Sequence, residues 1–184
     1  MEESFGGPQY LDPGIDYETN GWEVIQNTYE TLITFKDYWK SDEFMPLLAS
    51  KMPVWNEAGD SCNISLKTGI TFHDGTPFNA SCVKYSFDRA VIINDPNSPN
   101  WMWGGFVLGG STYMGSSGTE ADVMTFINGP DGDPDTPDQF TTVINDTCIQ
   151  NFFKLNYLLA NFSLAARAYL HQHISLDCHQ LTFR

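Results

Sequence analysis

The sequence predicts an α/β fold in which short strands alternate with amphipathic helices. The clearest evidence is the stretch 62–91, where alternating apolar residues lead into a capped helix. Apolar residues at helical spacing predict a second helix near the N-terminus. With 184 residues, the chain is long enough to form one ordinary domain with a real core.

The first part of the stretch 62–91 predicts a β-hairpin. Ile64 and Leu66 alternate with polar residues, and Ile70 and Phe72 do the same after a break at Gly69. Period-two alternation gives each run one apolar face, as expected for two half-buried strands. We therefore expect two strands joined by a tight turn at Thr68-Gly69.

The second part of this stretch predicts a turn and a helix. Asp74-Gly75 supplies the positive φ angle that a further tight turn requires. The short side chain of Asn79 can accept hydrogen bonds from the free N–H groups of a helix that begins at Ala80. The apolar face of this helix is expected to consist of Val83, Phe87, Ala90 and Val91.

This block resembles the signature of the family 5 extracellular solute-binding proteins, the receptors of oligopeptide, dipeptide and nickel ABC importers. The family pattern runs Leu-Lys/Arg-x-Gly-Val-x-Phe-His-Asp-Gly-Thr-Pro-Phe and continues into a helix that ends Tyr-Ser-Phe-x-Arg-Ala. The residues that match in register are Leu66, Lys67, Gly69, Phe72, His73, Asp74, Gly75, Thr76, Pro77, Phe78, Val83, Tyr85, Ser86, Phe87, Arg89 and Ala90. Cys82 departs from the pattern, because the family usually has an acidic residue there.

The resemblance implies the N-terminal part of a type II periplasmic-binding-protein-like fold, incomplete at this length. Residues 1–35 would be the start of the large lobe, with the remnant of a first strand at Gln9–Leu11 and then the first helix. Residues 36–162 would form an inserted α/β subdomain that contains the signature hairpin and helix. Residues 163–184 match nothing in the family, and we expect a disordered or out-of-frame tail there.

The remaining elements are expected in chain order. The first helix would be capped by Thr19 or Asn20 and would present one apolar face, made of Trp22, Ile25, Tyr29, Leu32 and Ile33. A short edge at Phe44–Ala49, which matches the family's x-Pro-x-Leu-Ala segment, would precede a strand at Lys51–Trp55. The segments Thr141–Asn145 and Cys148–Leu155 resemble the family's next two paired strands, so a strand pair is expected there.

The resemblance also implies a function and a ligand-binding wall. The intact protein would be the periplasmic or extracellular, cell-surface-associated receptor of an ABC importer, which captures a peptide, a nickel chelate or an oligosaccharide. Its partners would be ABC permease subunits with a separate ATPase, and it would meet the membrane only through the transporter or a lipid anchor. Alignment of the family motifs puts Tyr17, Gly21 and Trp22 in one ligand segment and Trp101 and Trp103 in another. Trp22 also lies on the apolar face of the predicted helix, so a place in the core is an equal alternative.

Composition and motifs argue against a nucleic-acid-binding protein, a protein that binds anionic membranes, and an enzyme. The formal net charge of −14 would repel nucleic acids and anionic membranes. A Gly-x-Ser-x-Gly elbow and a Walker loop are both absent from the sequence. We therefore expect no catalytic residue and no cofactor, and a protein that is not an enzyme.

Three alternatives remain open. Asp131, Asp133 and Asp135 alternate as at the start of a calcium loop, although the sixth and twelfth loop positions hold Thr136 and Thr142 instead of Gly and Glu. The exposed tryptophan cluster could instead serve a carbohydrate-binding module. The four cysteines, Cys62, Cys82, Cys148 and Cys178, allow three pairings into two disulfides, and a contact between Cys62 and Cys82 is one possibility.

Overall fold

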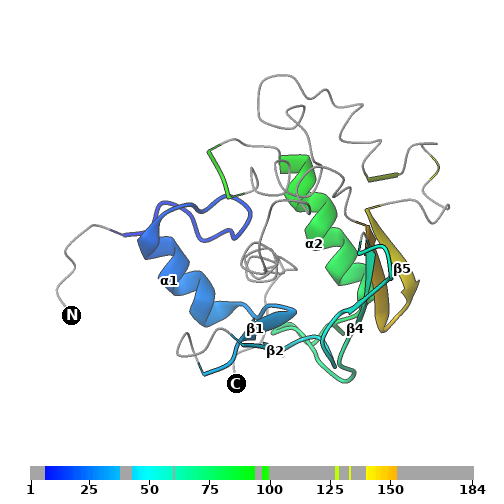
Figure 1. The fold of residues 1–184 in the computed structure, drawn as a ribbon. Helices are drawn as coiled ribbons and strands as arrows, with labels where there is room; N and C mark the ends of the chain where they lie inside the picture. Colours follow the sequence, from blue (N-terminus) through cyan, green and yellow to red (C-terminus); the bar gives the residue numbers. More distant parts are fainter. Residues whose placement is uncertain are drawn as a thin grey trace.

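The computed structural model describes residues 7–37, 43–59, 61–93, 97–99, 127–128, 133 and 140–152 (Figure 1). The elements in these ranges are the helices α1 (Thr19–Thr28) and α2 (Ala80–Ile93) and the strands β1 (Ile33–Phe35), β2 (Phe44–Pro46), β3 (Val54–Trp55), β4 (Ser61–Ser65), β5 (Thr141–Asn145) and β6 (Cys148–Phe152). The predicted α/β class is confirmed. Among the described residues, no helix is long and apolar enough to cross a membrane.

The main layer is a four-stranded antiparallel sheet with the strand order β3-β4-β6-β5. Ile64 of β4 lies opposite Ile149 of β6, and both side chains are buried. On β4, Cys62 and Ile64 are buried while Asn63 between them is exposed, as the alternation in the sequence predicts. The pairing of β5 with β6 confirms the predicted strands at 141–145 and 148–155, as far as the described residues extend.

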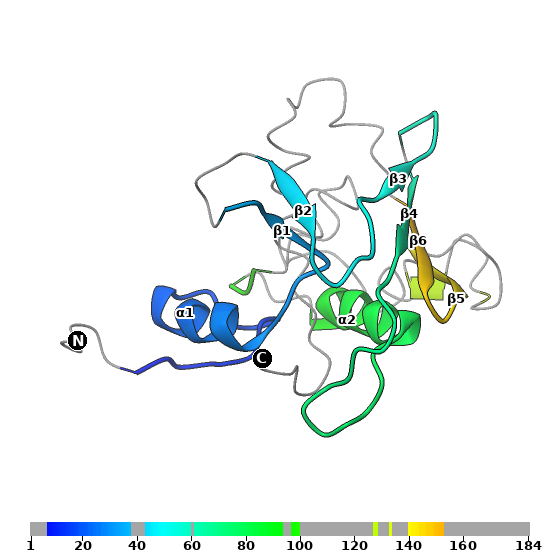
Figure 2. The same cartoon turned by 90° about the horizontal axis from the view of Figure 1, so that it is seen from below.

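Helix α2 covers one face of this sheet and lies between α1 and the sheet in both views (Figures 1 and 2). Val83 and Phe87 are 0% and 2% exposed, and the Phe87 ring meets the Phe140 ring edge to face, with centroids 5.9 Å apart. These residues belong to one hydrophobic core together with Ile64 and Ile149. Burial of a side chain as large as phenylalanine contributes roughly 1.5–3 kcal/mol, so this contact holds the helix firmly on the sheet.

A separate two-stranded ribbon, β1 with β2, is attached to the end of the sheet. The Ala49 N–H donates to the Leu32 carbonyl at 2.9 Å, and the Ser50 N–H donates to the Ser65 carbonyl at 2.8 Å. Leu32 and Leu48 are buried in the same core as α2. The segment after β2 therefore joins the ribbon and the sheet around one hydrophobic interior.

The start of α2 is confirmed as predicted. The N–H groups of Ser81 and Cys82 donate to Asn79 Oδ1 at 3.0 and 3.2 Å. The Ala80 N–H donates to the Asp146 carbonyl at 2.9 Å, so the β5–β6 turn also caps the helix. These bonds satisfy three of the N–H groups that the first turn of a helix leaves free.

The predicted hairpin across Thr68-Gly69 is wrong, because the neighbours of β4 are β3 and β6. Residues 70–78 form a loop instead, closed by an isolated bridge between Thr71 and Pro77, and Figure 2 shows it extending away from α2. β6 offers β4 a ladder five residues long, which a short local partner cannot match. The turn at Asp74-Gly75 does form, with Gly75 at φ +86°.

The first helix is shorter than predicted. It begins after Glu18, whose side chain does not cap it, so the expected cap at Thr19 or Asn20 is wrong. It ends at Thr28, and Ile33 belongs to a strand. Four of the five residues 31–35 are β-branched or aromatic and favour extended backbone, and β2 supplies the partner strand.

Three further expectations are corrected. Gln9–Leu11 does not form a strand, and only Val54–Trp55 of the expected strand 51–55 is extended and paired. Cys62, Cys82 and Cys148 are all free, so the Cys62–Cys82 disulfide is wrong. Burial raises the pKa of the Cys62 thiol to about 12.

Candidate functional site

The candidate site is the segment 10–22, which leads into α1 and contains the first three predicted ligand residues. Tyr17 is 60% exposed and lies just before the helix. Gly21 is buried in the first turn of α1, and Trp22 beside it is half-buried. The structure therefore brings these three residues together around the start of one helix. Trp101 and Trp103 lie outside the described residues, and the ligand role of all five stays a prediction.

A tight turn at residues 12–16 sets the path of this segment. The Asp12 carbonyl accepts hydrogen bonds from the N–H groups of Ile15 and Asp16 at 2.9 and 2.8 Å. Asp12 Oδ1 also accepts from the Gly14 N–H at 2.9 Å. An aspartate that bonds the backbone two residues later is a common way to stabilise a turn. Asp12 thus organises the turn with both its main chain and its side chain.

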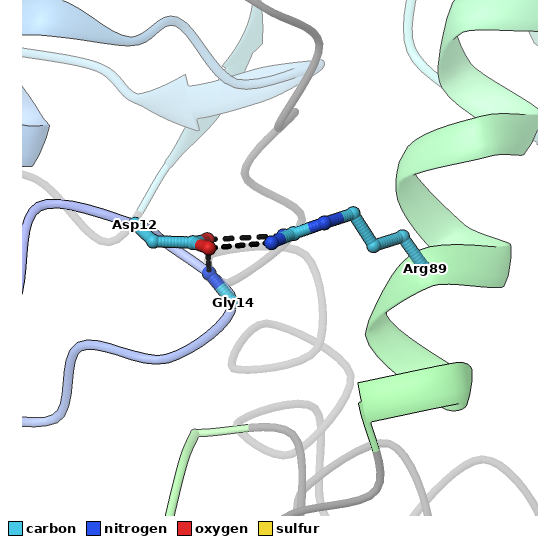
Figure 3. Close-up of polar contacts among 3 residues, drawn as sticks. All are labelled: Asp12, Gly14 and Arg89. Carbon is cyan, nitrogen blue, oxygen red and sulfur yellow. Dashed lines mark hydrogen bonds and ion pairs between the residues drawn. The ribbon is translucent and has the colours of Figure 1, made fainter.

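The same carboxylate forms a two-pronged ion pair with Arg89 of α2 (Figure 3). Arg89 Nη1 donates to Asp12 Oδ1 at 3.0 Å and Nη2 donates to Oδ2, across 77 residues of sequence. The side chains of Arg89 and Asp12 are only 25% and 28% exposed, so the pair is partly shielded from water. Sequence reasoning matched Arg89 to the family signature but did not predict its contact with Asp12, because a single sequence contains no signal of which distant charges meet.

Gly14 allows the turn to approach α2 this closely. A Cβ atom at Gly14 would lie 2.8 Å from both Arg89 Nη1 and Ile93 Cδ1. Side-chain carbon atoms do not come this close to neighbouring heavy atoms in folded proteins. Any other residue at this position would require the Arg89 guanidinium group and the Ile93 methyl group to shift.

Asp16 is the most unusual group in the segment. Its side chain is 1% exposed, and neither carboxylate oxygen makes a hydrogen bond. The carboxylate packs against Gly21, where a Cβ atom would overlap it. Burial raises the pKa of Asp16, and the negative charge of Glu18 raises it further. The sequence showed nothing that distinguishes Asp16 from the other acidic residues.

This environment predicts that Asp16→Asn raises the free energy of unfolding by an amount that depends on pH. At pH 7 the buried carboxylate is charged and unpaired, so we expect the amide to raise the free energy of unfolding by about 1 kcal/mol. Because the pKa is raised in the folded state, the native protein takes up a proton as pH falls through that pKa, and the gain should shrink. Urea denaturation at pH 7 and pH 4 measures it. Glu23→Gln, at an exposed position of α1, is the control and should have little effect at either pH. An equal increase in the free energy of unfolding at both pH values would contradict the raised pKa of Asp16 in the folded state.

Metal binding finds no support in the described part of the chain, where His, Cys, Asp and Glu residues form no group of three that could hold an ion. Asp133 is exposed, whereas Asp131 and Asp135 lie outside the described residues. The calcium loop therefore stays a prediction.

The sequence is similar to proteins of known role. A sequence model of the bacterial extracellular solute-binding proteins, family 5 (middle region) matches residues 43–161, more than half of the chain. The probable D,D-dipeptide-binding periplasmic protein DdpA of Escherichia coli K12 is 34% identical over 91 residues, which are 47% of this chain and 17% of that protein.

The fold is similar to that of solved periplasmic binding proteins. Listeria monocytogenes OppA bound to peptide superposes with a TM-score of 0.60 at 13% identity, over 93% of this chain and 29% of that one. Burkholderia pseudomallei OppA gives 0.59 at 16% identity, over 94% of this chain and 29% of that one. The chain thus has part of the α/β type II periplasmic-binding-protein fold, and it spans less than a third of the length of these relatives.

The family match covers β2 through β6, including the cap at Asn79 and the helix that bears Arg89. The chain belongs to the bacterial extracellular solute-binding proteins of family 5.

Proposed function

We propose that this chain forms one wall of a receptor that captures peptides outside the cytoplasm for an ABC importer. The observation that carries the proposal is the family match over residues 43–161. The name of the E. coli relative specifies a dipeptide, and one solved relative holds a peptide, which favours peptides over a nickel chelate or an oligosaccharide. The receptor acts by binding and not by catalysis, and it works in the periplasm or at the cell surface with permease subunits and a separate ATPase.

The exposed start of α1 supports this role. Tyr17, at 60% exposed, offers an aromatic ring to a ligand, and Tyr10 and Leu11 are also more than half exposed. Aromatic side chains contribute a large contact area at ligand-binding surfaces. The second wall, and with it the closed cleft, is provided by the rest of the receptor, as in two-lobed proteins that close by a hinge.

We also propose that the chain divides as the family resemblance implies. Residues 1–35 are the start of the large lobe, residues 36–162 are the inserted subdomain, and residues 163–184 follow as a tail. The segment 10–22 belongs to the first unit, and α2 belongs to the second.

The test uses the complete receptor that contains this chain. Isothermal titration with the probes D-Ala-D-Ala, L-Ala-L-Ala and trialanine should give micromolar or tighter binding for at least one peptide. A nickel–histidine chelate and maltotriose are the competing probes. Binding of the chelate or the sugar with no binding of any peptide would contradict the proposed substrate class. Glycan binding by the 184-residue chain alone would indicate a carbohydrate-binding module, and a large loss of thermal stability with EDTA would indicate a calcium-stabilised one.

A further inference from the structure

The Asp12–Arg89 ion pair connects two parts of the chain that the sequence separates by 77 residues. Asp12 belongs to the turn before α1, whereas Arg89 lies near the C-terminal end of α2. Figure 3 shows the guanidinium group reaching across from the helix to the turn, with Gly14 at the contact. The pair therefore links the candidate ligand segment to the layer of helix and sheet.

The α2 side of this link is well anchored. Two other residues of the helix, Val83 and Phe87, are buried in the core against the four-stranded sheet. Asn79 and the Asp146 carbonyl fix its first turn. Arg89 thus projects from an element that has little freedom to move.

The turn side depends on Asp12 for its shape. One carboxylate oxygen receives both Arg89 Nη1 and the Gly14 N–H, and the Asp12 carbonyl receives the next two N–H groups. A planar guanidinium that binds both carboxylate oxygens fixes the orientation of the carboxylate as well as its position. Because Asp12 holds the turn through these hydrogen bonds, its orientation also sets the path of the turn, which leads directly to Tyr17.

We propose that Arg89 is a positioning residue for ligand capture: it holds Asp12, and through Asp12 it sets how the turn presents Tyr17 and the start of α1 to the ligand. The inference rests on the proposed peptide-binding function and adds to it a residue that lies outside the binding segment. Arg89 acts through Asp12 and does not itself contact the ligand.

The chain contains a matched control on the same helix. Lys84 and Asp88 form a second ion pair with Nζ–Oδ2 at 3.1 Å, and their side chains are 24% and 17% exposed, similar to those of Arg89 and Asp12. Lys84 also donates to the Thr141 carbonyl at 3.1 Å, so this pair connects α2 to the sheet and not to the turn. Lys84→Ala therefore removes a comparable ion pair without touching the segment 12–16.

The first measurement is hydrogen–deuterium exchange of the complete receptor without ligand. Arg89→Ala should speed exchange of the Gly14, Ile15 and Asp16 amides at least tenfold, because the turn loses its external support. Arg89→Lys retains the charge but cannot bind both oxygens in the same plane, so it should restore protection only in part. Lys84→Ala should leave these three amides unchanged.

The second measurement is the affinity of the same variants for the peptide, among D-Ala-D-Ala, L-Ala-L-Ala and trialanine, that binds the wild-type receptor most tightly. Arg89→Ala should raise the Kd about tenfold or more and Arg89→Lys by less, whereas Lys84→Ala should change the Kd by less than twofold even if it lowers the melting temperature as much. Equal affinities for Arg89→Ala and Lys84→Ala would overturn the positioning role and leave the peptide-binding function intact. A wild-type receptor that binds none of these peptides would instead overturn the proposed function and, with it, this inference.

Discussion

Phe87→Ala is expected to lower the free energy of unfolding of the chain by about 3–5 kcal/mol. Phe87 is 2% exposed, lies in the core cluster and meets the Phe140 ring edge to face. Truncation removes this apolar surface and leaves a cavity between α2 and the sheet that the neighbouring side chains cannot fill without moving. Urea denaturation followed by circular dichroism measures the loss.

Tyr85→Ala is the matched control for Phe87→Ala. Tyr85 is on the same helix but is 48% exposed, so its removal should cost well under half as much. A similar loss for the two variants would contradict the packing of α2 against the sheet and would remove the fixed support that the positioning role of Arg89 requires.

Gly21→Ala is expected to destabilise the chain by about 2 kcal/mol, although alanine is the better helix former. Gly21 is the third residue of α1, where helix propensity alone would predict a gain of about 1 kcal/mol. A Cβ atom there would overlap the Asp16 carboxylate and would lie 2.7 Å from the Tyr10 carbonyl oxygen. Because the second of these neighbours is main chain, the segment 10–16 would have to move as a whole.

A double variant separates the energetic cost of the overlap with the Asp16 carboxylate from that of the overlap with the Tyr10 carbonyl oxygen. Asp16→Ala removes the carboxylate, so Gly21→Ala should cost less in that background, while the overlap with the Tyr10 carbonyl remains. Gln26→Ala, at an exposed position of the same helix, is the control and should change stability by no more than about 0.5 kcal/mol. A net gain from Gly21→Ala in the wild-type background would show that the segment does not pack on α1 as described.

The family and the position of its signature could be predicted because the evidence for them is local. The cap at Asn79, the start of α2 at Ala80 and the turn at Gly75 depend on residues close in sequence. Side-chain caps and positive φ angles are properties of a few neighbouring residues, so a motif of about thirty residues contains nearly all the information they require. The alternation at Ile64 likewise identified the buried face of β4.

The pairing of strands far apart in the sequence could not be predicted in the same way. The alternation around Gly69 is compatible with a local hairpin, but β4 pairs with β6, which lies more than eighty residues later in the chain. The end of α1 was missed for a related reason, since the partner of β1 at Ile33 is Pro46. Periodicity shows that a segment is extended and which face is apolar, but it does not show which other segment completes the ladder.

The sequence by itself determined the family, the α/β class and the capped helix that follows the signature turn, because each depends on short-range spacing of residue types. Only the tertiary structure decided that Arg89 meets Asp12, that Asp16 is buried without a hydrogen bond, and that Gly14 and Gly21 lie where a side chain has no room. The physical reason is that ion pairing, desolvation and steric exclusion act between atoms that are close in space, and the folded chain brings such atoms together from segments far apart in sequence.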